Sequence, residues 1–267
     1  MIGTPLGRHA PALDAVRTLL TKSGRREAGQ FAIEGATMLA EALAAEREIL
    51  ALYVTERGLD GLIGTGSLLD AVPGERIFIV DDRAMAKLSD LTTPPGVVAV
   101  LASDLQPLVT LLERGEPALV LAGIADPGNA GTLLRSAEIF GVRQAIFARE
   151  AVEPHNPKVV RATMGAIFRM RLAVADAADV VDAAHRNGYT IVAATRDGTA
   201  LPEFRFPERS LVAIGNERHG VSVWLPNYDS GVTIPQSGHG ESLNASVAGG
   251  IILYAFSQQF GNTIFEA

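Results

Sequence analysis

The apolar sequence Leu119-Val120-Leu121-Ala122 is followed, after three further residues, by Asp126-Pro127-Gly128-Asn129-Ala130-Gly131-Thr132-Leu133-Leu134-Arg135. A short apolar run, a small polar turn and a helical pattern together predict a strand, a loop and a helix. Two later apolar runs, at 211–214 and 232–234, are also followed by glycines and polar side chains. Because parallel strands expose their carboxyl ends at one edge of a sheet, we expect these three places to collect a ligand.

The C-terminal half of the chain alternates apolar runs with helical patterns. The runs lie at 119–122, 145–148, 172–174, 190–194, 211–214 and 232–234. They are nearly continuous, which is typical of strands that are covered on both faces in an open parallel sheet. Residues 130–140 and 246–259 have the apolar spacing of helices. The fold class that this pattern predicts is α/β, with a doubly wound parallel sheet.

The N-terminal half has the pattern of a smaller α/β unit. Residues 31–50 space their apolar side chains as a helix does, and the segments at 51–54, 77–80 and 97–101 have the pattern of short buried strands. The segment between 103 and 117 is polar and contains prolines, and the regular alternation of apolar runs and helical patterns begins after it. We therefore predict an N-terminal domain over 1–104, a linker over 105–117 and a C-terminal domain over 118–267.

Composition argues against several classes of protein. A chain of 267 residues with 48% hydrophobic content can bury a sizeable core, which argues against disorder. No apolar stretch reaches the roughly 18 residues of a membrane span, and the N-terminus lacks a signal-peptide core, so we expect a cytoplasmic protein without a membrane partner. The chain has no cysteine, and its five histidines lack metal-ligand spacing, so we expect no disulfide and no metal.

The net charge of −7 argues against a nucleic-acid partner, since phosphate binding normally requires a basic surface. Two local groups of basic residues depart from this average. They contain Arg8, Arg17, Lys22, Arg25 and Arg26 in the first group and Lys158, Arg161, Arg169 and Arg171 in the second. Either these are solvated surface charges, or they bind phosphates. The candidates for nucleic-acid binding are Arg8, Lys22, Arg25, Arg26, Lys158 and Arg161.

The polar residues after the strands carry the candidate chemistry. Neither G-x-G-x-x-G after a strand nor G-x-x-x-x-G-K-[ST] occurs, which disfavours a nicotinamide or triphosphate cofactor. Asn129 and Arg135 either present an amide and a guanidinium to a phosphate or ribose, or are a helix cap and a surface arginine. Gly215 and Gly220, on either side of Glu217, allow the backbone to approach a ligand closely.

A third block, Ser242-Leu243-Asn244, follows a glycine-rich loop and precedes an apolar helix, where several N–H donors are exposed. With it, the chain contains Asn129-x-Gly131-x-x-x-Arg135, Gly215-x-Glu217-x-x-Gly220 and Ile234-Pro235 followed by Ser242-Leu243-Asn244-x-Ser246-x-Ala248. These blocks resemble, in order and spacing, the three motifs of the SpoU (TrmH-like) branch of the SPOUT RNA methyltransferases. Residues 158–166 also resemble a family segment. Residues 25–35 are similar to the start of the family's small substrate-binding domain, which is related to ribosomal RNA-binding proteins.

The resemblance implies a C-terminal α/β domain with a deep trefoil knot, S-adenosyl-L-methionine as cofactor, RNA as partner and a homodimer. The knot loops at 195–198, 215–220 and 234–243 are then expected to hold the cofactor, mostly through backbone groups. The residues that the resemblance assigns to cofactor binding are Thr195, Gly215, Asn216, Gly220, Ile234, Gln236 and Leu243.

The implied reaction is methyl transfer to a ribose 2′-hydroxyl, with Arg135, Asn129, Glu217, Ser242 and Asn244 as catalytic residues. A guanidinium stays protonated at ordinary pH, so we expect Arg135 to hold the neighbouring phosphate and stabilise the developing alkoxide rather than act as the base. Glu217 is expected to orient Arg135 or the loops, and Asn129 to fix the ribose or phosphate. Ser242 and Asn244 are expected to hold the last motif and the substrate in place. Histidines 219 and 239 occupy variable motif positions and are expected only to pack or cap.

Ribosomal RNA is the favoured substrate because the accessory N-terminal domain resembles those of rRNA-modifying relatives. A tRNA 2′-O-methyltransferase is the first alternative. A catalytically inactive RNA-binding protein of the same fold is disfavoured because the five catalytic residues are retained. A small-molecule α/β enzyme with a nucleotide cofactor is disfavoured because the phosphate loops are missing.

Overall fold

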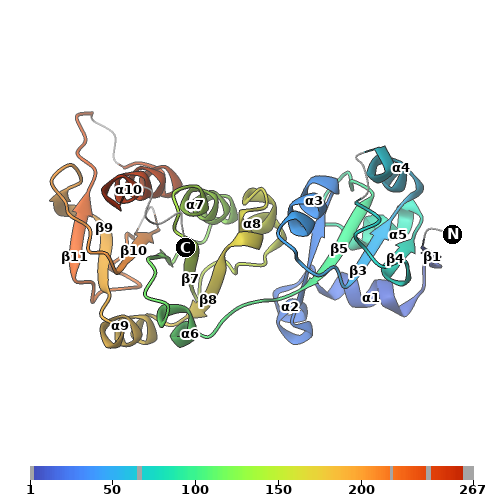
Figure 1. Ribbon diagram of the computed structural model, residues 1–267, viewed down its shortest axis with the longest axis horizontal. Coiled ribbons are helices and arrows are strands. Elements are labelled where there is room, and N and C mark those ends of the chain that lie inside the picture. Colours follow the sequence, from blue (N-terminus) through green and yellow to red (C-terminus); the bar gives the residue numbers. More distant parts are fainter. Residues whose placement is uncertain (1–2, 65–67, 217–218, 239–241, 261–267) are drawn as a thin grey trace. The chain divides into compact units, whose positions relative to one another are not determined.

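The computed structural model describes residues 3–64, 68–216, 219–238 and 242–260. The chain divides into two compact units, which Figure 1 shows as ribbons. The N-terminal unit comprises Met1–Ser103 and His155–Phe168, and the C-terminal unit comprises Asp104–Pro154 and Arg169–Ala267. The chain therefore passes between the units at three points. The predicted domain limits differ from this division, because they assign residues 155–168 to the C-terminal domain.

The N-terminal unit is built on a five-stranded mixed sheet in the order β1-β4-β3-β5-β2. Its strands are β1 (Thr4–Pro5), β2 (Gln30–Glu34), β3 (Ala51–Val54), β4 (Ile77–Ile79) and β5 (Val97–Ala102). Strand β5 runs antiparallel to β2 and β3, whereas β1, β3 and β4 are parallel. The helical segments of this unit are α1 (Pro11–Thr18), α2 (Lys22–Ala28), α3 (Ala36–Ala44), α4 (Glu56–Gly64), η1 (Gly74–Arg76), α5 (Asp82–Leu88) and α8 (Pro157–Ala162).

The prediction of a helix over 31–50 is wrong in its N-terminal part. Strand β2 occupies that part and pairs antiparallel with β5. Gly35 then turns the chain into α3 with a φ of +91°, a conformation that glycine adopts without steric cost. Phe31 and Ile33 are buried together with the residue between them, and such a short unbroken apolar run does not distinguish a strand from a helix.

The C-terminal unit is built on a six-stranded sheet in the order β11-β9-β10-β6-β7-β8, in which every neighbouring pair is parallel. Its strands are β6 (Ala118–Ala122), β7 (Gln144–Ala148), β8 (Arg171–Ala175), β9 (Thr190–Ala200), β10 (Ser210–Gly215) and β11 (Ser230–Thr233). Its helices are α6 (Leu108–Leu112), α7 (Pro127–Ile139), α9 (Ala177–Arg186) and α10 (Ala245–Phe260), and η2 (Ala166–Arg169) spans the last passage between the units. The predicted α/β class with a parallel sheet is confirmed.

The segment predicted as a linker, 105–117, contains helix α6. Leu111 and Leu112 of this helix are buried in the core of the C-terminal unit. The helix spans only five residues and lies between two prolines, Pro107 and Pro117, so the turn signals on both sides conceal it in the sequence.

Strand β9 departs from the regular ladder where it runs along β11. Gly231 pairs with Ala193, whereas the next residue, Val232, pairs with Thr199, so residues 194–198 leave the ladder as a bulge. At the end of the bulge, a Cβ added to Gly198 would lie 2.4 Å from the carbonyl carbon of Gly231. Only glycine allows this approach of two backbones. The bulge projects from the sheet beside the carboxyl ends of β10 and β11.

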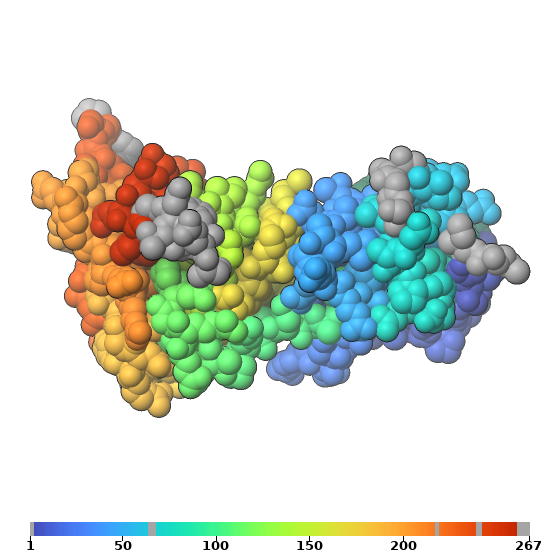
Figure 2. Space-filling view, viewed as in Figure 1, coloured from blue at the N-terminus to red at the C-terminus, as the bar shows by residue number. Residues whose placement is uncertain are grey.

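Helix α10 packs against α7, and the two lie side by side in Figure 1, with the red atoms of α10 beside the light-green atoms of α7 in Figure 2. A Cβ added to Gly249 would lie 2.2 Å from Cδ2 of Leu133, so the contact leaves no room for a side chain at this position of α10. The packing therefore holds α10 against α7, the helix that follows β6 in the chain.

Within the N-terminal unit, Arg161 joins helix α8 to the sheet. Its guanidinium donates hydrogen bonds of 2.6 and 3.1 Å to the two carboxylate oxygens of Asp90 and lies 3.5 Å from Glu34. The hydroxyl of Ser89 also donates to Glu34. Burial raises the pKa of the Glu34 carboxyl. Burial alone would raise the pKa of Asp90, but the hydrogen bonds and the charge of the Arg161 guanidinium outweigh burial, so the pKa of Asp90 is lowered.

Replacing Arg161 should therefore weaken the protein in a pH-dependent way. We expect Arg161→Ala to lower the free energy of unfolding by about 1–2 kcal/mol at pH 7, because Asp90 then keeps its charge without its partner. The pKa of Asp90 is lowered in the folded state, so its stabilisation is present above the unfolded-state pKa and lost as pH falls through the folded-state pKa. The difference between wild type and variant should shrink below about pH 5.

Urea unfolding of both proteins at several pH values measures this difference. Arg149→Ala, which removes an exposed pair with Asp176, is the matched control and should cost less than about 1 kcal/mol. A loss from Arg161→Ala that stays the same down to pH 3 would show that packing, not charge, is the contribution of Arg161.

Candidate functional site

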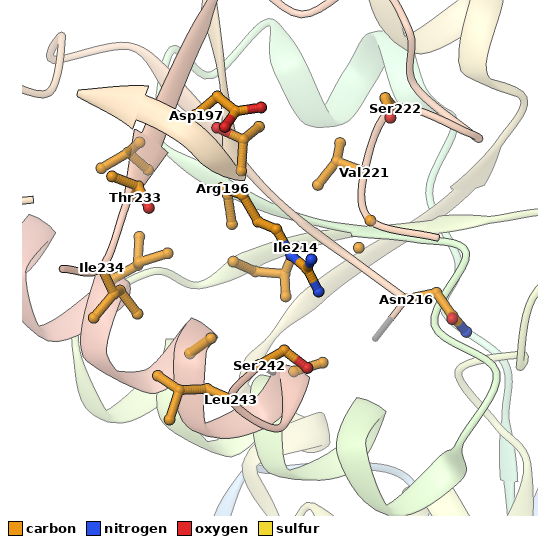
Figure 3. Close-up of a pocket in the computed structure, with 18 of the residues that line it drawn as sticks. Arg196, Asp197, Ile214, Asn216, Val221, Ser222, Thr233, Ile234, Ser242 and Leu243 are labelled. Atoms are coloured by element: carbon orange, nitrogen blue, oxygen red, sulfur yellow. The ribbon is translucent and has the colours of Figure 1, made fainter. Parts of the chain in front are cut away.

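A cavity of about 420 Å³ opens beside the bulge of β9 and the carboxyl ends of β10 and β11, and Figure 3 shows it in close-up. Its walls come from the bulge of β9, from the turn after β10, and from the chain between the end of β11 and the first turns of α10. All seven residues that the resemblance assigns to cofactor binding line it: Thr195, Gly215, Asn216, Gly220, Ile234, Gln236 and Leu243. Thr195 and Leu243, which are 48 positions apart in the chain, thus line the same cavity.

The turn after β10 depends on two glycines. The N–H of Gly220 donates to the carbonyl of Asn216 at 2.8 Å, which closes the turn. A Cβ added to Gly215 would lie 2.2 Å from the carbonyl carbon of Gly220, so no other residue fits there without moving the backbone. Glu217, which stands between the two glycines and is a predicted catalytic residue, lies outside the described residues, as does His239.

Asn244 connects the first and third motifs. Its side-chain oxygen accepts hydrogen bonds from the N–H of Ser246 at 2.9 Å and of Val247 at 3.3 Å, and from the hydroxyl of Ser246 at 2.6 Å, so it caps α10. Its side-chain nitrogen donates at 3.0 Å to Oδ1 of Asn129, 115 residues away in the chain. Asn129 lies in the first turn of α7, where its own N–H donates to the carboxylate of Asp126 at 2.7 Å.

The other predicted catalytic residues occupy different places. Ser242 is exposed and lines the cavity. Arg135 is exposed on α7, does not line the cavity, and makes no hydrogen bond or ion pair with another described residue. The structure therefore joins Asn129 to Asn244 and places Ser242 in the cavity wall, while the guanidinium of Arg135 is available to a ligand outside it.

The cavity also contains two charged residues that lie in the predicted cofactor loop at 195–198 but are not among the seven predicted cofactor-binding residues. Arg196 and Asp197 stand in the bulge of β9, and the side chain of Arg196 extends toward Ile214 in the middle of the cavity (Figure 3). The signal in the sequence was a short polar stretch, Thr195-Arg196-Asp197-Gly198, directly after the predicted strand at 190–194. Because the observed strand continues to Ala200, only the pairing register shows that this stretch leaves the ladder.

The structure separates the predicted RNA-binding residues into two groups. Lys22, Arg26 and Lys158 are exposed and make no side-chain hydrogen bond or ion pair with another described residue. The other three are engaged within the N-terminal unit, namely Arg8 with Asp81 at 2.5 Å, Arg25 with the carbonyl of Leu19 at 2.7 Å, and Arg161 with Asp90 and Glu34.

Arg25 departs furthest from its prediction, because it is only 6% exposed. A buried guanidinium that holds a backbone carbonyl stabilises the end of α1 and has little surface left for a phosphate. Lys22, Arg26 and Lys158 are therefore the better candidates for contact with an anionic polymer.

No group of three or more His, Asp or Glu side chains is placed to hold a metal ion anywhere in the ranges that the structure describes. Over the same ranges, no helix combines the length and the apolar character that crossing a bilayer requires.

The double role of Asn244 can be separated by two substitutions. We expect Asn244→Ala to lower the free energy of unfolding by about 1 kcal/mol, because α10 loses its cap. Asn244→Asp should stay close to wild type, since a carboxylate accepts the same N–H groups and is favoured at a helix N-terminus. Urea unfolding measures both, with Asn227→Ala as an exposed control. Equal losses for the two Asn244 variants would place the stabilisation in the contact with Asn129 instead.

The chain matches two family models, the SpoU rRNA Methylase family over residues 116–254 and the MRM3-like substrate binding domain over residues 11–99. A 23S rRNA (uridine(2479)-2′-O)-methyltransferase of Streptomyces viridochromogenes is 30% identical over 89% of this chain and 86% of its own length. The 23S rRNA (guanosine-2′-O-)-methyltransferase RlmB of Coxiella burnetii is 31% identical over 81% of this chain and 90% of its own length.

Among solved structures, the SpoU methyltransferase AviRb from Streptomyces viridochromogenes in complex with AdoMet superposes with a TM-score of 0.83 at 27% identity. This similarity covers 93% of the present chain and 97% of that one. The family model covers more than half of the chain, and the three motifs on which the resemblance rested lie within its range. The protein therefore belongs to the SpoU rRNA methylase family.

Proposed function

We propose that the protein is an S-adenosylmethionine-dependent RNA 2′-O-ribose methyltransferase that acts on ribosomal RNA in the cytoplasm. The observation that carries this proposal is the cavity beside the bulge of β9 and the carboxyl ends of β10 and β11, which all seven predicted cofactor residues line. The names of the relatives that match over most of both chains, several of them 23S rRNA 2′-O-methyltransferases, favour ribosomal RNA over transfer RNA.

The cavity fits this cofactor in size and in the chemistry of its walls. Its volume of about 420 Å³ is in the usual range for small-molecule sites. Ile234, Leu243 and Ile252 supply apolar surface for a purine ring. The close crossing of Gly215 and Gly220 brings backbone N–H and carbonyl groups to the wall, where polar ring edges and hydroxyls require partners.

The cofactor supplies a sulfonium methyl group, a strong electrophile, so the protein's main task is to place the ribose oxygen and stabilise its charge. The guanidinium of Arg135 has no partner among the described residues, which suits it to hold the phosphate beside the target ribose while that phosphate or water takes the proton. Asn129, held by Asn244 at 3.0 Å, presents its amide to the ribose or phosphate in a fixed orientation. Ser242 positions the substrate from the cavity wall, and Glu217 is proposed to orient Arg135.

The proposed RNA surface lies on the N-terminal unit, whose residues 11–99 match a substrate binding domain. Lys22, Arg26 and Lys158 offer cations that no other described residue engages. A few local cations suffice to hold phosphates on a protein whose net charge is −7, because the Debye length at physiological salt is only about 8 Å.

We also propose that the protein is a homodimer that pairs through the outer face of α7 and α10. This face exposes large apolar side chains: Ile139 (55%), Val247 (49%), Ile251 (39%) and Tyr254 (53%). Thr132, Ser136 and Phe140 complete a shallow apolar groove between the two helices. Adjacent apolar side chains at this exposure are typical of an interaction surface. A second copy of the chain would cover the helix that carries Asn129 and Arg135.

Arg135 provides the test of the catalytic proposal. Purified protein with isotope-labelled S-adenosylmethionine should label 23S rRNA, and Arg135→Ala should reduce transfer at least about 100-fold because the phosphate clamp is lost. The affinity for the cofactor should stay within about tenfold, or 1.4 kcal/mol. Arg143→Ala, which removes an exposed arginine outside the cavity, is the control. Comparable losses of transfer and cofactor affinity would place Arg135 in the cofactor site, and labelling of tRNA alone would overturn the rRNA assignment.

The dimer proposal predicts that charge on the apolar groove separates the subunits. Ile251→Glu combined with Tyr254→Glu should convert a dimer into a monomer and reduce methyl transfer at least about tenfold, because burying two carboxylates costs several kcal/mol. Light scattering after size exclusion measures the mass. Val223→Glu, at a side chain that is 72% exposed elsewhere in the C-terminal unit, should remain dimeric. A wild-type monomer with full activity would refute the proposal.

A further inference from the structure

A charged residue outside the three sequence motifs stands in the wall of the cofactor cavity. Arg196 belongs to the bulge in which residues 194–198 leave β9, opposite Gly231 and Val232. Its side chain extends toward Ile214 in the middle of the cavity (Figure 3). The bulge is anchored at its end by the close backbone contact of Gly198 with Gly231. The irregular register of β9 thus accompanies a guanidinium in the cavity wall.

Arg196 forms no ion pair within the described structure. It is the only lysine or arginine among the described residues that line the cavity, and Asp197 is the only carboxylate. Arg196 is exposed and makes no hydrogen bond or ion pair with another described residue. An unpaired guanidinium in a concave site attracts an anion, and its planar fork matches a carboxylate or phosphate with two parallel hydrogen bonds.

S-adenosylmethionine carries one anionic group, the carboxylate of its methionine part. Its sulfonium and ammonium are cations, and its adenine is neutral and suits the apolar wall of Ile234, Leu243 and Ile252. We propose that Arg196 binds the methionine carboxylate and thereby makes the site selective for the complete cofactor over adenosine compounds that lack an amino-acid part. This inference rests on the proposed use of the cofactor and adds a specificity-determining residue to it.

The proposed contact between Arg196 and the methionine carboxylate also restricts the orientation of the methyl group. A flexible ligand held at its carboxylate by Arg196 and at its adenine by the apolar wall has fewer directions in which the group between them can point. Binding energy from the non-reacting end of the cofactor would then contribute to orienting the methyl group toward the ribose.

Ligand truncation combined with substitution tests the proposal. Titration calorimetry compares wild type, Arg196→Ala, Arg196→Lys and the control Arg143→Ala with three ligands: S-adenosylmethionine, S-adenosylhomocysteine and 5′-methylthioadenosine, which lacks the amino-acid part. We expect Arg196→Ala to weaken the first two ligands about 10- to 100-fold, because a charge-assisted hydrogen bond is lost. The affinity for 5′-methylthioadenosine should change less than about twofold. Arg196→Lys should be intermediate, and Arg143→Ala should match wild type.

Other outcomes would overturn the proposal in distinct ways. Equal losses for all three ligands would show that Arg196 shapes the cavity rather than binds the carboxylate. Unchanged affinity for S-adenosylmethionine with weaker RNA binding would assign Arg196 to an RNA phosphate. If wild type binds 5′-methylthioadenosine as tightly as S-adenosylmethionine, no group selects the carboxylate. Wild-type protein that binds none of the ligands would refute the proposed function itself and this inference with it.

Discussion

The close passage of backbone segments past one another at the bulge of β9 and at the end of β10 is the constraint on which the rest of the site depends. Gly198 against Gly231, and Gly215 against Gly220, approach until an added Cβ would lie within 2.4 Å of a carbonyl carbon. Glycine at these points removes the side chains that would otherwise separate the segments. Three loops from different parts of the chain can then enclose one cavity with backbone groups in its walls, a geometry that suits a small ligand with polar edges.

The same region shows how structural and chemical roles share residues. Asn244 caps α10 with its oxygen and holds Asn129 with its nitrogen, so the group that begins the last helix also orients a side chain of the first motif. Gly249 allows α10 to lie directly on Leu133 of α7, which keeps the two motif-bearing helices in contact. A cap and a close helix contact thus hold the proposed ribose-binding amide without any residue devoted only to that task.

The six predicted RNA-binding cations differ in their availability to a ligand. Arg8, Arg25 and Arg161 are engaged within the N-terminal unit, whereas the side chains of Lys22, Arg26 and Lys158 have no partner among the described residues. Because salt screens the net charge of −7 beyond a Debye length of about 8 Å, recognition of RNA depends on short-range contacts and shape. The proposed clamp by Arg135 and the proposed carboxylate contact of Arg196 follow the same rule, because each guanidinium has no partner among the described residues and is proposed to bind a single anionic group.

The sequence by itself determined the class of the C-terminal sheet, the resemblance to the family's motifs and seven of the residues that line the cavity. It could do so because near-continuous apolar runs report burial on both faces, and because glycine and polar residues after a strand occupy fixed motif spacings. The apolar pattern predicted a helix where β2 lies, and the prolines on both sides of α6 concealed that helix. The predicted domain limits placed α8 in the C-terminal domain, whereas it belongs to the N-terminal unit. Only the tertiary structure decided the bulge of β9, the burial of Arg25 and the pairing of Arg161 with Asp90. Each of these follows from strand register or from contacts between residues far apart in the chain, and local patterns carry no information about such partners.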